Sequence, residues 1–170
     1  MKKMKKPKTD EYNEFYQGYI SQVGDQEVFG FLERNIEEYV VYIKSQEDTR
    51  LSYSYAPEKW TLSQVLGHIS DVERVMAYRI LRFSRKDKTE IPGFDQDHYV
   101  ENGFFDSSRQ SYIKEIEALR SANLELIRNL RDEQLSYTGI ADGNLFTVRA
   151  LIYILAGHMS HHLNVLKKRY

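Results

Sequence analysis

The sequence predicts an all-α protein: a four-helix bundle with one short additional helix near the N-terminus. Chain breakers are scarce, since the 170 residues include only 9 Gly and 3 Pro, and this composition favours helices. Apolar side chains recur at three- and four-residue spacing in four long stretches, the period of an amphipathic helix. In addition, 158–162 contains three of the 5 histidines of the chain and follows the last apolar run, so any special chemistry is expected there.

Composition narrows the class of protein. The 24 basic and 25 acidic residues nearly cancel, which argues against electrostatic binding to nucleic acid or to anionic membranes. Cysteine is absent, which excludes disulfides, Cys-ligated metals and Cys nucleophiles and fits a reducing compartment. No apolar run is long enough to cross a bilayer. The basic start lacks the apolar region of a secretory signal. We therefore expect a cytoplasmic protein with a disordered basic tail at 1–10 and one domain over 11–170.

The first half of the domain contains two predicted helices. Aromatic and apolar residues from Tyr12 to Ile20 indicate a short amphipathic helix on the outside of the bundle, with core packing favoured over a substrate-contacting role. Asp25 to Ser45 keeps one apolar face and predicts the first bundle helix. The polar segment 45–59 is expected to be an extended linker.

The second bundle helix begins at a capping box, in which the Thr61 hydroxyl and the Gln64 side chain cap one another's backbone amides. His68 lies at the edge of the buried stripe that follows, and Asp71 can share its face. Glu73 is expected to be a solvated charge. The basic residues at the end of this helix complement its dipole, and anion binding is the less favoured role for them; they are Arg79, Arg82, Arg85 and Lys86.

Two irregular segments separate the remaining helices. The first, 88–106, is long and rich in aromatic and acidic residues, so it either covers the mouth of a site or is a structured surface crossover. Its His98 is a possible ligand or base, although a lone loop histidine is usually neither. A third helix is predicted over 107–130, where Arg120 and Asn123 either line a polar pocket or bond to a neighbouring helix. A turn-rich link over 132–145 follows.

The fourth helix is predicted to start at Thr147, a good N-cap, and to run close to Tyr170. Its bundle seam is expected to follow alternating four- and three-residue steps. This spacing predicts that the seam residues are Leu151, Leu155, His158, His162, Val165 and Arg169. Two histidines would then occupy positions where a bundle usually has leucine.

The buried histidines predict a metal site. His158 and His162 lie four residues apart and stack on one helical face, and His68, which also follows a glycine, is the best third ligand. Three neutral imidazoles suit Zn²⁺ or Ni²⁺, with Fe²⁺ and Mn²⁺ as alternatives. Asp71 is the candidate to orient a ligand histidine, whereas His161 points elsewhere. From spacing alone, a structural polar network is the alternative to a metal.

Three motifs resemble the DinB-like family, which includes the DinB proteins of bacilli, the YfiT-type metal-dependent hydrolases and the bacillithiol and mycothiol S-transferases. The motifs are Lys59-Trp60-Thr61-Leu62, Leu66 to Arg74 with Gly67-His68, and Gly157-His158-Met159-Ser160-His161-His162-Leu163. The resemblance implies an up-down-down-up bundle, often dimeric, with a divalent metal held by His68, His158 and His162. It also implies that a low-molecular-weight thiol is a possible cosubstrate.

Three functions follow as expectations. The first is a metal-dependent enzyme that transfers a thiol, of the bacillithiol type, to small electrophiles, with the segment at 92–106 shaping the pocket. The second is a hydrolase that uses metal-bound hydroxide. The third is a non-catalytic, metal-stabilised dimeric bundle. An open metal position facing a cavity would favour catalysis, whereas a closed, tightly packed centre would favour the third function.

Overall fold

The computed structural model describes residues 4–170. Its backbone is mostly helical, as the sequence predicts, with one small antiparallel hairpin. The helices are α1 (Gln17–Val23), α2 (Val28–Ser45), α3 (Leu62–Ser84), α4 (Gln96–Asn102), α5 (Arg109–Arg128) and α6 (Val148–Arg169). The strands are β1 (Thr138–Ala141) and β2 (Asn144–Thr147), and short 3-10 turns lie at Thr9–Glu11, Glu14–Tyr16, Asp48–Arg50 and Asp132–Ser136. Within this described part, no helix has the length and apolar character needed to cross a membrane.

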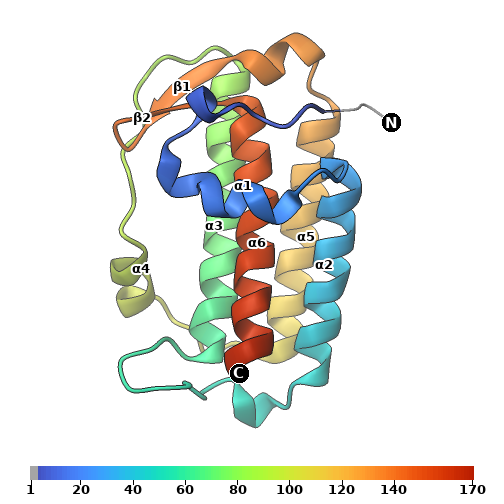
Figure 1. Ribbon diagram of the computed structural model, residues 1–170. Helices are drawn as coiled ribbons and strands as arrows, with labels where there is room; N and C mark the ends of the chain where they lie inside the picture. The colour runs from blue at the N-terminus through green and yellow to red at the C-terminus, as the bar shows by residue number, and fades with distance from the viewer. Residues whose placement is uncertain (1–3) are drawn as a thin grey trace.

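The four long helices α2, α3, α5 and α6 form the bundle (Figure 1). Helices α2 and α6 run down in this view, while α3 and α5 run up. Helix α6 contacts both α2 and α3, and α5 contacts the same two helices from the other side. This arrangement is the up-down-down-up bundle that the family resemblance implies. Because α3 and α5 run in the same direction, the chain between them must return along the whole bundle.

That return accounts for the long segment after α3. Residues 85–108 descend along the outside of the bundle and include α4 (Figure 1). The Asp95 carboxylate caps α4 by accepting hydrogen bonds from the amides of Asp97 and His98, at 3.0 and 3.1 Å. The segment is therefore a structured crossover, which is one of the two expected alternatives, and it also lines a cavity described below. The sequence did not predict α4.

The link before α6 contains a hairpin that the sequence analysis took only as turns. Ala141 pairs with Asn144, which leaves Asp142 and Gly143 as a two-residue turn, and their φ angles of 53° and 68° are those of a type I′ turn. Ile91 of the crossover forms a parallel bridge with Ala141. The hairpin therefore holds the crossover against the top of the bundle.

The N-terminal segment also differs from expectation. Residues 1–3 of the predicted disordered tail lie outside the described residues, but Met4 is 4% exposed and its carbonyl accepts a 3.1 Å hydrogen bond from the Tyr153 hydroxyl. Glu11 pairs with Arg149 at the start of α6. The tail prediction is therefore wrong for 4–10. The predicted short helix on the outside of the bundle is present as α1, which crosses α6 (Figure 1).

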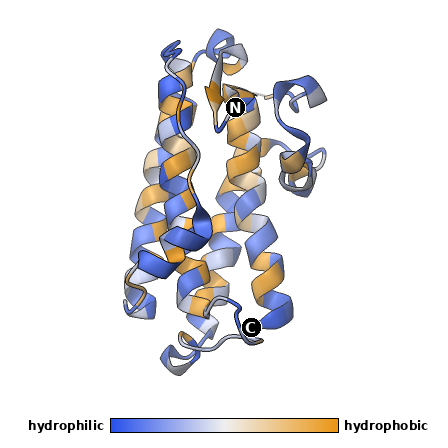
Figure 2. Ribbon diagram, turned by 90° about the vertical axis from the view of Figure 1, so that its left-hand side faces the viewer, coloured by the Kyte–Doolittle hydropathy of each residue, from blue (hydrophilic) through white to orange (hydrophobic). Residues whose placement is uncertain are grey.

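Apolar residues alternate with polar ones along each long helix (Figure 2), and the buried ones form two core clusters, an upper and a lower one. On α6 the upper cluster ends at Ala156 and the lower one begins at Met159. The predicted α6 seam is correct through His162 and wrong at Val165 and Arg169. Leu163 and Leu166 fill the lower core, whereas Val165 is only partly buried and Arg169 is exposed.

Between the two core clusters lies a buried polar set that we call the arginine network: Asn35, Glu73, Arg120 and Asn123. Glu73 is 1% exposed and pairs with Arg120, so the prediction that it is a solvated charge is wrong. The Asn123 amide donates to Glu73 at 2.7 Å. Arg120 also donates to the Asn35 side chain and to the carbonyl of Leu32, both at 2.8 Å. The network joins α2, α3 and α5, and Asn35 extends it to α6 through the Ala156 carbonyl.

Candidate metal centre

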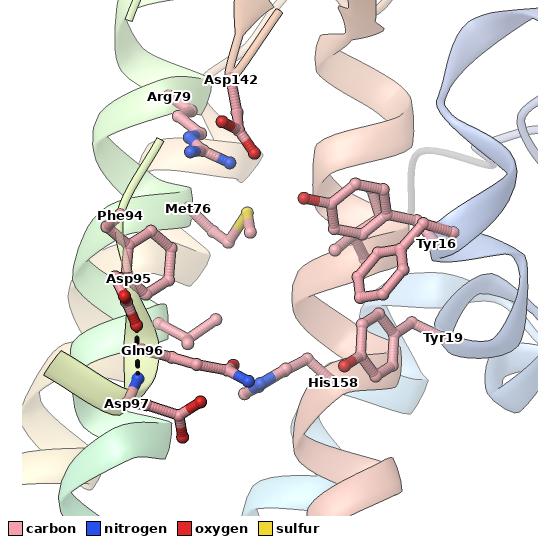
Figure 3. A pocket seen from close by; sticks show the side chains of 13 residues that line it. Tyr16, Tyr19, Met76, Arg79, Phe94, Asp95, Gln96, Asp97, Asp142 and His158 are labelled. Atoms are coloured by element: carbon pink, nitrogen blue, oxygen red, sulfur yellow. Dashed lines mark hydrogen bonds between the residues drawn. The ribbon is translucent and has the colours of Figure 1, made fainter. Parts of the chain in front are cut away.

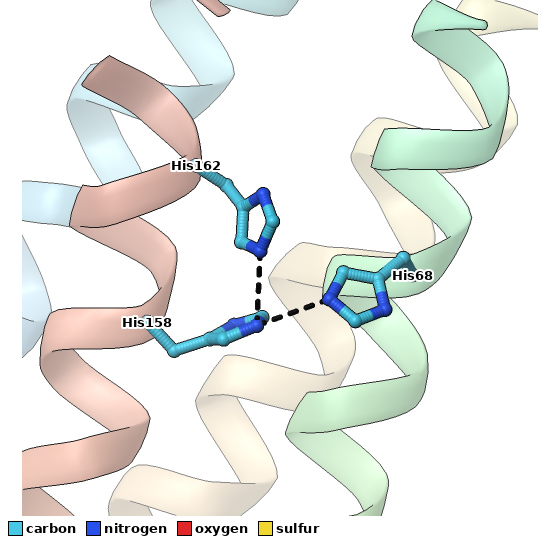
Figure 4. Close-up of side chains that lie close together, drawn as sticks. All are labelled: His68, His158 and His162. Carbon is cyan, nitrogen blue, oxygen red and sulfur yellow. Dashed lines mark hydrogen bonds between the residues drawn. The ribbon is translucent and has the colours of Figure 1, made fainter. Parts of the chain in front are cut away.

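The three predicted histidines converge from α3 and α6. The Nε2 atom of His158 lies 3.1 Å from Nε2 of His68 and 3.1 Å from Nε2 of His162. All three ligand atoms lie within 4.8 Å of one another, and the rings point toward a common centre (Figure 4). His68 and His158 are buried, while His162 is partly exposed. We call His68, His158 and His162 the histidine cluster.

Local sequence features fix the two helices that carry these rings. The predicted capping box at the start of α3 is present, since Gln64 N donates to the Thr61 hydroxyl at 3.3 Å and Thr61 N donates to the Gln64 side chain at 2.8 Å. Thr147 caps α6 through the amide of Ala150, at 3.1 Å. These caps set where each helix begins and therefore which residues face the neighbouring helix.

Glycines beside two of the histidines allow close approach. A Cβ atom on Gly157 would lie 1.8 Å from the backbone oxygen of Tyr19, so α1 can cross α6 there only because the side chain is missing. A Cβ atom on Gly67 would overlap the ring of Phe105 at 2.1 Å. The two glycines therefore allow α1 and the crossover to pack next to the histidine cluster, with the aromatic residues Tyr19 and Phe105 at the points of contact.

Burial keeps the three imidazoles neutral. It lowers the pKa of His68 to about 4, and burial together with the nearby imidazoles of His68 and His161 lowers the pKa of His162 to about 3. Burial, then the neighbouring His162 and His68, hold the pKa of His158 well below its usual value. Since metal ligands must be unprotonated, the cluster is ready to bind a cation at neutral pH.

The geometry fits a metal better than a hydrogen-bond network. A neutral imidazole nitrogen is either a donor or an acceptor, so Nε2 of His158 cannot form good hydrogen bonds to both neighbours at once. Ligand nitrogens on a tetrahedral zinc ion, with Zn–N of about 2.0–2.1 Å, lie about 3.3 Å apart. The two 3.1 Å separations are close to this value. His68, His158 and His162 therefore fit one divalent ion.

One side of the histidine cluster faces a cavity of about 370 Å³. His158 lies at one end of it and Arg79 at the other, with α1, α3, the crossover, the hairpin turn and α6 all contributing to the wall (Figure 3). Tyr16 and Tyr19 form one side, and Phe94 and Met76 form part of the opposite side. A ligand in this cavity can reach His158.

The other candidate residues are not joined to the cluster. Asp71 pairs with Arg74 at 3.5 Å, and within residues 4–170 no hydrogen bond connects it to a histidine of the cluster, so the role assigned to it is not observed. His98 is exposed on α4, where its Nδ1 lies 3.2 Å from the Asn102 amide nitrogen. His161 is exposed and packs against Tyr19, with 5.4 Å between ring centroids. As expected, His161 is not one of the converging ligands.

Sequence reasoning missed most of the cavity. Phe15, Tyr16 and Tyr19 line it, although core packing was the favoured role for their segment. Arg79 was expected only to complement the dipole at the end of its helix, yet it is 2% exposed and lines the same cavity. Its spacing offers a signal, because Arg79 follows Val72 and Met76 at steps of four and three on the buried face.

Comparisons with known proteins agree with this geometry. A protein of Oceanobacillus iheyensis named "putative metal-dependent hydrolase" is 27% identical over 127 residues, which are 74% of this chain and 73% of that protein. Among solved structures, YfiT from Bacillus subtilis matches with a TM-score of 0.74 and 18% identity, over 97% of this chain and 93% of that one. YfiT is described as a probable metal-dependent hydrolase with an unusual four-helix bundle topology, and the likeness shows that the two share a fold.

The sequence model of the DinB superfamily matches residues 32–166. This match includes α3, α5 and most of α2 and α6, together with the three converging histidines. The family resemblance read from the motifs is therefore confirmed, and the chain belongs to the DinB superfamily.

Proposed function

We propose that this protein is a divalent-metal-dependent enzyme that transfers a low-molecular-weight thiol to small electrophiles. The observation that carries the proposal is the position of His158, which belongs to the histidine cluster and also lines the 370 Å³ cavity. Three protein ligands leave a coordination position free, and a free position is typical of catalytic metal sites. A free position next to a cavity gives a substrate access to the metal.

The residues around the cluster suit a water-poor site for a thiolate. A bound metal would favour the thiolate form of the thiol at neutral pH. The Trp60 ring packs on His68, with centroids 4.9 Å apart, and Tyr19 packs on His158 at 5.4 Å, so aromatic rings fix both imidazoles. The reaction is R–SH + R′–X → R–S–R′ + HX, in which a C–S bond forms, the C–X bond breaks and the thiol proton leaves with X.

A hydrolase is the second candidate, and the names of the two relatives favour it. In that case a water molecule takes the place of the thiol, and the exposed Asp97 on the cavity wall is a candidate to accept its proton. A non-catalytic metal-stabilised dimer is less well supported, because a purely structural site needs no cavity beside its ligands. We retain a homodimer as a proposal to be tested by light scattering.

The test is metal quantification followed by an activity screen. Wild type purified with Zn²⁺ or Ni²⁺ is expected to hold about one ion per chain and to conjugate a thiol to chlorodinitrobenzene faster than the metal-free protein does. His162→Ala should lose both properties, and His161→Ala, an exposed neighbour, should keep them. Metal-dependent ester hydrolysis without thiol conjugation would replace the transferase by the hydrolase. If wild type purified with Zn²⁺ or Ni²⁺ holds no metal, both the transferase and the hydrolase proposals are refuted.

A further inference from the structure

A buried arginine, Arg79, lies at the end of the cavity opposite His158 (Figure 3). Arg79 is 2% exposed, and its Nε atom has no hydrogen-bond partner. Over residues 4–170 no ion pair of Arg79 is found either. Its guanidinium carbon, Cζ, lies over the ring of Phe94, 6.0 Å from the ring centroid. A buried guanidinium without an ion pair in the protein is costly, and an anionic group bound in the cavity would supply that pair.

Arg120 shows what a satisfied buried arginine looks like in the same molecule. It is equally buried, at 2% exposed, but it pairs with Glu73 and donates to the Asn35 side chain. Both arginines project from long bundle helices, one from α3 and the other from α5. The contrast indicates that the fold can supply partners for a buried arginine and does not do so for Arg79.

The charges on the cavity wall limit which anions can bind beside Arg79. Asp95, Asp97 and Asp142 are exposed carboxylates on the wall of the cavity, and Asp142 lies at the same end as Arg79 (Figure 3). One cation among three anions tolerates a singly charged ligand better than a doubly charged phosphate. A carboxylate also matches the planar fork of a guanidinium.

The middle of the cavity is apolar. Val72, Met76 and Ile154 line it together with the rings of Tyr16 and Phe94. Such a wall favours a ligand with an aliphatic or aromatic body. Arg79 also lies three helical turns beyond His68 on α3, a rise of about 16 Å, so a ligand held there is separated from the histidine cluster.

We propose that the cavity binds a small carboxylic acid, with its carboxylate on Arg79 and its apolar body extending toward His158. That this acid is the substrate rests on the proposed function, whereas the binding site itself does not. The reacting group would then be presented to the histidine cluster by the body of the ligand. Arg79 would thus select the substrate class without touching the reacting atoms.

The test uses benzoate, its uncharged isostere benzamide, and inorganic phosphate, titrated into zinc-loaded and metal-stripped protein. Binding is measured by calorimetry and by the NMR resonance of the Arg79 Nε–H group. Benzoate should shift this resonance and bind roughly tenfold or more tightly than benzamide and more tightly than phosphate. Metal removal should change benzoate affinity little. Arg79→Gln should weaken benzoate roughly tenfold or more, and Arg82→Gln should not, since Arg82 pairs with Asp87 outside the cavity.

Equal affinity for benzoate and benzamide, tighter phosphate binding, or unchanged benzoate binding in Arg79→Gln would each overturn the proposal. Loss of benzoate binding on metal removal would also overturn it, because the metal would then be the anion site. If Arg79→Gln does not fold, the wild-type comparison of benzoate with benzamide still decides. Benzoate binding in a protein without thiol-transfer or hydrolytic activity would refute the proposed function and leave the carboxylate site standing.

Discussion

Two buried polar clusters lie at the same level of the bundle, between its upper and lower apolar cores, and they differ in how their polar atoms are satisfied. In the arginine network, Glu73 and Arg120 pair with one another, and hydrogen bonds with Asn35 on α2 and Asn123 on α5 satisfy more of their polar atoms. In the histidine cluster, three neutral nitrogens face one another across 3.1 Å gaps. The charged groups of the arginine network find their partners within the protein, whereas the histidine cluster directs nitrogen lone pairs at a position that suits a cation.

The difference shows how one buried polar region of a bundle can contain both a stabilising ion pair and a metal-binding site. A satisfied buried ion pair ties the helices together, and removing one partner strands a charge. An unsatisfied set of lone pairs is tolerated because the imidazoles stay neutral, and it faces a cavity through His158. The arginine network should therefore govern stability, while the histidine cluster should govern metal binding.

The largest expected effect comes from breaking the arginine network. Arg120→Met should lower the free energy of unfolding by about 3–5 kcal/mol, because Glu73 is left as a buried, unpaired charge. Urea unfolding of the metal-free protein measures this. Arg128→Met, which removes an exposed arginine paired with Glu33, should cost about 1 kcal/mol or less. A similar small loss for Arg120→Met would contradict the structural role.

The same comparison predicts a different outcome for the histidine cluster. At free metal of 100 times Kd, wild type should gain about 2.7 kcal/mol of stability, and His162→Ala should lose this gain while its metal-free stability changes little. Unfolding with and without Zn²⁺, together with elemental analysis, measures both quantities. His98→Ala, an exposed histidine on α4, is the matched control. Undiminished metal content in His162→Ala would remove this residue from the ligand set.

Acid should weaken the metal-free protein through the same histidines. The pKa of His68 is lowered to about 4, below the unfolded value of about 6.5. Between these values the unfolded chain binds protons that the folded chain excludes, so stability falls as the pH falls. From His68 alone we expect a loss of about 2 kcal/mol between pH 7 and pH 5. His68→Met should remove this part of the pH dependence measured by urea unfolding, while His158 and His162, whose pKa values are also lowered, keep their own parts. An unchanged profile would show that burial of the His68 ring does not contribute.

Short-range patterns accounted for most of what the sequence could predict. The capping box at Thr61 and the cap at Thr147 depend on residues three apart, and the pairing of His158 with His162 depends on one helical turn. The addition of His68 needed one further assumption, that the histidine-bearing faces meet. The caps and the His158–His162 pair were correct because helical periodicity fixes them locally, and the added assumption about His68 also proved correct.

Long-range partners explain what the sequence did not reveal. Glu73 is buried because Arg120, 47 residues away, neutralises it, and no pattern within α3 shows that pairing. The seam of α6 drifts after His162 because the lower core, which includes Leu163 and Leu166, sets the register there. The cavity is built from five separate segments, so its wall could not be read from any one of them.

The smallest effect tests how the wall of the cavity is held beside the histidine cluster. Gly157→Ala places a Cβ atom against the backbone of Tyr19, so α1 must shift away from α6, at a loss of about 1–2 kcal/mol in unfolding free energy. Gly18→Ala, on α1 itself, meets nothing within 4 Å and should instead stabilise by about 0.5–1 kcal/mol, as alanine does in a helix. Because Tyr19 contacts His158 and lines the cavity, Gly157→Ala should also weaken benzoate binding while metal content persists. Equal stability of the two variants would mean that the position of α1 does not depend on this close crossing. The cavity wall formed by α1 would then be held in place by other contacts than the one at Gly157.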